Sequence, residues 1–144
     1  MIALDTNILV YAHRADSPFH EPARSAIESL AAGGRPWAIP WPCAHEFFAI
    51  VTHPRIYKTA TPPGTAFAQL RALHALASLA FITEAEDHLQ RLAPLALAAK
   101  VQGGAIHDAR IAAICLSHGV AELWSADRDF SRFPSLTVRN PLIG

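Results

Sequence analysis

Four acidic residues occupy positions from which their carboxylates could act together. Asp5 and Asp127 each follow a short apolar run, whereas Glu46 and Asp108 each lie near the start of a helical pattern. In an open α/β sheet, ligands bind beyond the carboxyl ends of the strands, so we expect Asp5 and Asp127 at one edge. Carboxylates that gather in one place repel one another and raise one another's pKa unless a cation neutralises them. We therefore predict that the four acids form a divalent metal site.

The ligand types narrow the choice of metal. Carboxylate oxygens suit Mg²⁺ or Mn²⁺, and two such ions can activate a water and stabilise the leaving oxygen of a phosphodiester. Zinc is disfavoured because no clustered set of cysteine and histidine ligands is present; Cys43 and His45 lack a second ligand pair. His107 beside Asp108 could shuttle protons, although a histidine at a helix start also has a structural explanation.

Three of the acids have a plainer explanation as well. Asp5 could cap the helix that follows it. Glu46 could be a surface residue, and Asp108 a residue at a helix N-terminus, each favoured by the helix macrodipole. Asp108 is the most informative, because its helix is otherwise apolar on most faces and burial of an unpaired charge is costly. Arg110 is a poor partner for Asp108, since residues two apart on a helix do not face each other.

Short polar residues beside the acids could support them. Thr6, Asn7 and Ser125 could donate hydrogen bonds to the carboxylates or hold a water, and each is also a common turn residue. Asp129 is a fifth acid, either an outer ligand or a cap for the turn that follows.

Charge is unevenly distributed along a chain that is neutral overall. Twelve basic and twelve acidic residues give a formal net charge of zero, so attraction of nucleic acid must come from a local patch. No acid lies between Glu46 and Glu84, an interval that contains several basic side chains. These are His53, Arg55, Lys58, Arg71 and His74. A helix and a loop with a basic solvated face would produce the same pattern.

The cysteine count and the lengths of the apolar runs indicate in which compartment the protein is found. Two cysteines, Cys43 and Cys115, are too few for a disulfide scaffold and fit a reducing compartment. No uncharged run matches the roughly 20 apolar residues of a membrane helix. The first strand begins at Ile2, which leaves no room for a signal segment. We expect a cytoplasmic protein that does not enter a membrane.

Apolar runs alternate with helical spacings over the whole chain. Strands are predicted at residues 2–4, 35–40, 80–83, 120–124 and 136–138. Helices are predicted to begin near residues 8, 18, 43, 62, 84 and 105, and Pro94 should kink or divide the fifth. This alternation predicts a single α/β domain, residues 1–144, with a mainly parallel sheet and helices on both faces.

Four short motifs connect the chain to a known family. They are LDTNIL at residues 4–9, HEF at 45–47, IHDARIAA at 106–113 and SADRDF at 125–130. In this order and at these structural locations, they resemble the PIN-domain ribonucleases, most closely the VapC-type toxins of bacterial toxin–antitoxin pairs. Each motif is weak alone, but the four together form a specific signal that runs essentially from end to end.

The resemblance implies a three-layer α/β/α domain that cleaves RNA endonucleolytically with Mg²⁺ or Mn²⁺. Asp5, Glu46, Asp108 and Asp127 would be the metal-binding, catalytic acids, and Ser125 stands where the family usually has Thr or Ser. We expect one ion, held chiefly by Asp5 and Asp108, to activate the attacking water. Contacts to RNA phosphates and bases are expected from the segment after the Glu46 helix. These residues are His53, Arg55, Tyr57 and Lys58.

The resemblance also implies protein partners. A small cognate antitoxin would hold the enzyme in check, and similar proteins are commonly homodimers. The helices within residues 62–100 could share apolar surface in a dimer, although a core-facing stripe explains their pattern equally well.

Two other functions are open from sequence alone. A PIN-fold module could bind RNA or an antitoxin without cutting. A phosphotransfer receiver also clusters acids at strand ends, but it needs an acceptor Asp after a middle strand and a Lys after a late one. Pro40 and Glu84 follow the middle strands and Arg139 the last, so the receiver is disfavoured.

Overall fold

Five short parallel strands form the centre of the molecule. The computed structural model describes residues 1–143, and its sheet has the strand order β3-β2-β1-β4-β5. The strands are β1 (Ile2–Leu4), β2 (Trp37–Pro40), β3 (Leu79–Ile82), β4 (Glu122–Trp124) and β5 (Thr137–Arg139). Every neighbouring pair is parallel, so the carboxyl ends of all five strands meet at one edge.

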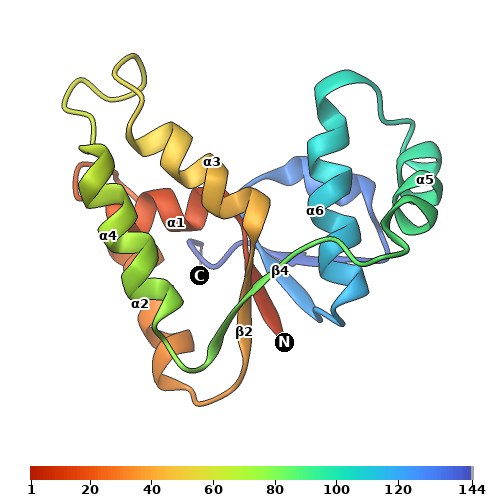
Figure 1. The fold of residues 1–144 in the computed structure, drawn as a ribbon, viewed down its shortest axis with the longest axis horizontal. Coiled ribbons are helices and arrows are strands. Elements are labelled where there is room, and N and C mark those ends of the chain that lie inside the picture. The colour runs from red at the N-terminus through yellow and green to blue at the C-terminus, as the bar shows by residue number, and fades with distance from the viewer. Residues whose placement is uncertain (144) are drawn as a thin grey trace.

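Helices cover both faces of this sheet. They are α1 (Thr6–His13), α2 (His20–Ala32), α3 (Trp41–Val51), α4 (Pro63–His74), α5 (His88–Ala98) and α6 (Ile106–Ser117), with 3₁₀ turns η1 (Gly103–Ala105) and η2 (Arg128–Arg132). Figure 1 shows α1–α4 on one side and α5 and α6 on the other, because the chain reverses direction across the sheet after β3. The predicted three-layer α/β/α fold is confirmed. Within residues 1–143, no helix is long and apolar enough to span a membrane.

Large buried side chains join the three layers. Leu4, Ile39 and Leu123 of the central strands have no exposed surface. Phe47 of α3 and Ile114 of α6 belong to the same core cluster. Because both faces of these strands are covered, the strands are apolar except for Glu122 at the start of β4, and the positions at which they end are firmly set.

The start of α2 differs from the prediction. The helix begins at His20 rather than Pro18, because Ser17 closes a turn first. The Ser17 hydroxyl accepts a hydrogen bond from the Phe19 backbone N–H (3.1 Å), and its carbonyl accepts one from the His20 N–H (3.2 Å).

The start of α5 also differs. It begins at His88 rather than Glu84, and the Glu84 carboxylate forms a salt bridge with Arg110 of α6. Pro94 lies inside α5 without dividing it. The ion pair ties the residues before α5 to α6, which explains why the helix starts late.

Replacement of Leu123 by Ala should destabilise the fold strongly. The side chain is fully buried in β4, so the substitution leaves a cavity and should lower the free energy of unfolding by about 2–5 kcal/mol. Urea denaturation would measure the change, with Leu97→Ala as a control because Leu97 is 78% exposed. Equal stability of the two variants would contradict the described core.

Candidate metal centre

The end of β1 places Asp5 at the carboxyl edge of the sheet. Its side chain is only 5% exposed, and its backbone N–H donates to the Trp124 carbonyl of β4 (3.0 Å). One carboxylate oxygen accepts a hydrogen bond from the Thr6 N–H (2.8 Å), so Asp5 does cap α1. The other accepts one from the Ser125 hydroxyl (2.6 Å). Asp5 therefore caps α1 and, at the same time, presents its carboxylate at the carboxyl edge of the sheet.

Asn7 and Ser125 tie the end of β1 to the end of β4. The Asn7 side-chain amide donates to the Ser125 hydroxyl and to Asp5, each at 3.3 Å. Its carbonyl accepts from the Ala126 N–H (3.1 Å), and the Ser125 hydroxyl accepts from the Asp127 N–H (2.9 Å). These bonds fix the two strand ends relative to one another, so the Asp5 and Asp127 carboxylates are held on one side.

Helix α3 supplies Glu46. The helix starts directly after β2, with Pro42 in its first turn, and buries Cys43, Ala44, Phe47 and Val51 against the core. This leaves Glu46 facing the strand ends, where the Thr6 hydroxyl donates to its carboxylate (3.2 Å). Thr6 thus orients a carboxylate from a distant part of the chain.

Helix α6 and the η2 turn supply the remaining acids. Asp108 lies in the first turn of α6, and Asp127 caps η2 by accepting a hydrogen bond from the Asp129 N–H (2.8 Å). One carboxylate oxygen from each of Asp108, Asp127 and Asp129 lies within 4.8 Å of the other two. Asp129, which the sequence suggested as an outer ligand or a turn cap, therefore lies in the same cluster as Asp108 and Asp127.

A cavity of about 260 Å³ brings the four predicted acids together. Its wall also contains Thr6, Asn7 and both tyrosines of the chain. Asp5, Glu46, Asp108 and Asp127 come from four different elements or their ends. We call this cavity the acid pocket.

Burial and mutual repulsion raise the pKa of three carboxyl groups of the acid pocket, those of Asp5, Glu46 and Asp108. Burial raises the pKa of Asp5, and burial followed by the charge of Asp5 raises that of Glu46. Burial, then repulsion from Asp127 and Asp5, raises the pKa of Asp108 to about 6. Within residues 1–143, no lysine or arginine forms a salt bridge with these acids. The pocket therefore favours a cation supplied from outside the chain.

The donor set fits a hard divalent ion. All close ligands are carboxylate oxygens, with hydroxyl and amide groups behind them, and such oxygen-only sites suit Mg²⁺ or Mn²⁺. Cys43 is fully buried and donates its S–H to Asp5 (3.5 Å), while burial raises the pKa of its thiol well above the ordinary value. A protonated thiol is a poor metal ligand, so Cys43 supports Asp5 instead.

Two residues close to the acids, Tyr11 in the pocket wall and Cys43 behind Asp5, were not predicted from the sequence to belong to the site. Tyr11 lines the wall, and its spacing of four from Asn7 on α1 could have indicated this. Cys43 was interpreted only as a packing residue or a weak metal-ligand candidate. Nothing in its local pattern points to the hydrogen bond with Asp5, because that contact joins β1 to α3.

The residues predicted to contact RNA lie in the loop between α3 and α4, residues 52–62, which we call the α3–α4 loop. Only Tyr57 of this group lines the acid pocket. His53, Arg55 and Lys58 are exposed on the same loop. The loop thus presents two basic side chains next to one residue of the pocket wall.

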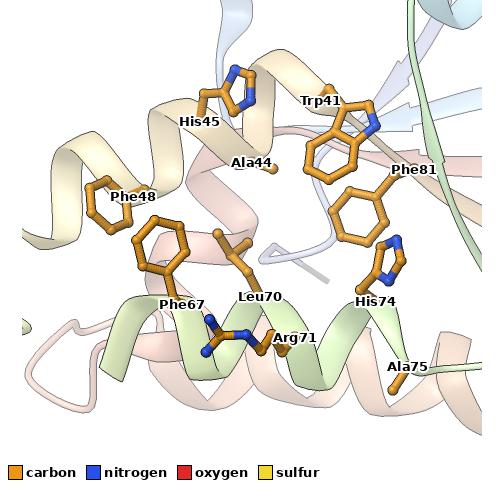
Figure 2. Close-up of a pocket in the computed structure, with 10 residues that line it drawn as sticks. All are labelled: Trp41, Ala44, His45, Phe48, Phe67, Leu70, Arg71, His74, Ala75 and Phe81. Atoms are coloured by element: carbon orange, nitrogen blue, oxygen red, sulfur yellow. The ribbon is translucent and has the colours of Figure 1, made fainter. Parts of the chain in front are cut away.

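A second cavity, of about 620 Å³, lies between α3 and α4 and is drawn in Figure 2. Its residues are mainly aromatic or aliphatic, and Trp41 stacks near Phe81 with ring centroids 4.7 Å apart. Phe67 of α4 is 47% exposed here and packs against Phe48. This cavity has the composition of a protein-binding groove rather than of a catalytic site.

The fold and the carboxylate site together define a class of protein. The sequence pattern of the PIN domain matches residues 2–136, and the chain belongs to the PIN-domain family. Ribonuclease VapC43 of Mycobacterium tuberculosis is 36% identical over 144 residues, which cover all of this chain and 97% of that protein.

Solved structures agree with this assignment of the fold. VapBC2 from Rickettsia felis, bound to a promoter DNA fragment, contains a chain that superposes with a TM-score of 0.71 at 21% identity. The match covers 97% of this chain and 98% of that one. A toxin-antitoxin complex from Klebsiella pneumoniae gives a TM-score of 0.65 at 22% identity, covering 98% of each chain.

The raised pKa of Asp108 predicts a pH-dependent stability in metal-free buffer. Between pH 3.8 and about 6, Asp108 binds more protons in the folded chain than in the unfolded chain, so its contribution to stability should fall as pH rises through this window. Asp108→Asn removes the charge and should stabilise the protein at pH 7 by about 1 kcal/mol, because solvent screens a half-buried group.

Thermal melts in EDTA at several pH values would measure this effect. The control is Asp87→Asn, since Asp87 is an exposed acid paired with Arg91. A loss of stability at pH 7 in Asp108→Asn would show that contacts within the chain already neutralise this acid.

Proposed function

We propose that the protein is a Mg²⁺- or Mn²⁺-dependent endoribonuclease and the toxin of a toxin–antitoxin pair. The observation that carries the proposal is the gathering of four carboxylates from distant parts of the chain in one pocket without a basic partner among residues 1–143. The ribonuclease name of VapC43 supports RNA as the substrate.

The ligands of the ion would be the acids of the pocket. Asp5 and Asp108 would hold it chiefly, and Glu46 and Asp127 would complete the site or orient waters. When bound, a divalent ion supplies Lewis acidity that activates water for attack on phosphorus. The chain's own contribution is orientation: Ser125 holds Asp5, and Thr6 holds Glu46. These bonds keep the carboxylates in place although they repel one another.

Substrate RNA would lie across the α3–α4 loop. Arg55 and Lys58 are exposed there, and neither forms a salt bridge among the described residues. They are available for phosphates, while Tyr57 lies at the pocket wall. His53 accepts a hydrogen bond from the Arg55 backbone N–H (3.1 Å) and shapes the turn.

We further propose a small antitoxin as partner and a homodimer as the assembly. The Klebsiella pneumoniae structure, a toxin-antitoxin complex, supports the first. Exposed aromatic surface on α3 and α4 around Trp41 and Phe67 supports a protein partner in general, because isolated monomers rarely leave such patches open.

Loss of one carboxylate should abolish RNA cleavage. Asp5→Asn or Asp108→Asn removes a charged ligand, and we expect the rate to fall at least about 100-fold, as for other groups that stabilise a charged transition state. Purified protein, free of partners, would be incubated with mixed RNA in Mg²⁺ and in EDTA.

Asp87→Asn is the matched control, because Asp87 lies outside the pocket and pairs with Arg91. Retained cleavage in Asp5→Asn or Asp108→Asn would refute the assignment of these acids. A folded wild-type protein that cuts no RNA in Mg²⁺ or Mn²⁺ would favour the non-cleaving RNA- or antitoxin-binding module.

Removal of the two basic side chains of the α3–α4 loop should weaken RNA binding and make it less dependent on salt. Arg55→Ala/Lys58→Ala should reduce the slope of log affinity against log salt by about 1.4, the value for two phosphate contacts on a single strand. Fluorescence anisotropy over a salt series would measure the slope. Arg24→Ala/Arg91→Ala, two exposed arginines on α2 and α5, is the charge-matched control. A slope equal to that of wild type would exclude the loop from the RNA contact.

A further inference from the structure

Arg14, at the end of α1, is nearly enclosed although it is an arginine. Its side chain is 11% exposed. The guanidinium donates to both carboxylate oxygens of Asp16 (2.9 and 2.6 Å), to the Thr59 carbonyl (2.8 Å) and to the Thr61 hydroxyl (3.3 Å). Its carbon lies 4.0 Å from the centre of the Tyr57 ring. One side chain therefore joins α1 to three residues of the α3–α4 loop.

A second contact holds the same loop at its base. The His13 ring lies 3.0 Å from the Thr61 hydroxyl, and the Thr61 N–H donates to the Val51 carbonyl (2.7 Å). Burial, followed by the charge of Arg14, lowers the pKa of His13, so this histidine is neutral. Thr61 is 6% exposed. The loop is thus anchored at Thr61, and Arg14 adds the contact that reaches out to Tyr57.

Tyr57 occupies a position where substrate would pass. It lines the acid pocket together with Tyr11, so both tyrosines of the chain lie beside the carboxylates. The neighbours of Tyr57 on the loop, Ile56 and Lys58, are exposed, whereas Tyr57 is half-buried. A half-buried aromatic ring next to a site for phosphodiester chemistry has the properties of a stacking surface for a base.

We propose that Arg14 is a positioning residue that fixes Tyr57 at the wall of the acid pocket, where Tyr57 stacks on a base of the RNA next to the bond that is cut. This inference rests on the proposed ribonuclease function. Arg14 does not bind phosphate itself, because Asp16 already neutralises its charge and the loop covers it. A rigid, cation-backed ring loses little conformational entropy when it binds a base.

The proposal requires arginine at position 14. A planar guanidinium can donate in several directions while its face covers an aromatic ring. Lysine keeps the charge but offers a single ammonium, which cannot make the Asp16 pair, the Thr59 contact and the ring contact together. Arg14→Lys should therefore release Tyr57 without altering net charge.

The test measures kcat and KM for cleavage of a short single-stranded RNA in Mg²⁺. Tyr57→Ala and Arg14→Lys should each raise KM about tenfold, as expected for loss of one stacked base, with kcat changed by less than about twofold. The double variant should match Tyr57→Ala, because Arg14 acts through Tyr57. Tyr57→Phe keeps the ring and should bind RNA more tightly than Tyr57→Ala.

Arg24→Lys, an exposed arginine paired with Glu21 and Glu28 on α2, is the matched control for the substitution. Circular dichroism of each variant checks the fold. An unchanged KM in Tyr57→Ala, or a further tenfold rise when Arg14→Lys is added to it, would overturn the inference. If the wild-type protein cuts no RNA, the proposed function fails. In that case the inference is tested by RNA affinity instead, measured by fluorescence anisotropy with the same RNA carrying a label. Tyr57→Ala and Arg14→Lys must still weaken RNA binding equally.

Discussion

The main constraint on the structure is the electrostatic repulsion between several carboxylates that lie together at the end of a buried sheet. Asp5 is almost completely buried, and Asp108 is forced to a pKa of about 6 by burial and by its acidic neighbours. Such an arrangement opposes folding unless hydrogen bonds fix each group and a cation compensates the charge. Donors from Thr6, Asn7 and Ser125 meet the first requirement for Asp5 and Glu46, and the Asp129 N–H meets it for Asp127. The second requirement is the reason why we propose a divalent cation in the acid pocket.

The strand order makes this gathering possible. Because β1 lies between β2 and β4, the ends of all three strands open at the centre of one edge, where α1, α3 and η2 begin. Asp5 leads into α1, and Glu46 and Asp127 enter from the flanking elements. Asp108 arrives from α6 on the opposite layer. The α3–α4 loop lies at the same edge, and Arg14 contacts its Tyr57. The four acids and the residue proposed to contact the substrate therefore line one pocket.

Three of the four acids have a local signature in the sequence, whereas Glu46 was selected through its neighbours and the family motif. Asp5 and Asp127 follow apolar runs, and Asp108 interrupts an otherwise apolar helix. Other features depend on contacts between distant segments. The contact between Arg14 and Tyr57 forms only when the α3–α4 loop folds back on α1. The late start of α2 depends on a turn at Ser17 whose hydrogen bonds compete with helix initiation, a balance that residue preferences alone do not resolve.

Anomalous diffraction from crystals soaked in Mn²⁺ tests the central claim most directly. The account predicts an anomalous peak inside the acid pocket, within coordination distance of carboxylate oxygens from Asp5 and Asp108. Asp108→Asn crystals treated identically should show a weaker peak or none. A fully ordered pocket without a peak at saturating Mn²⁺, or a peak only at a surface site outside the acid pocket, would contradict the account.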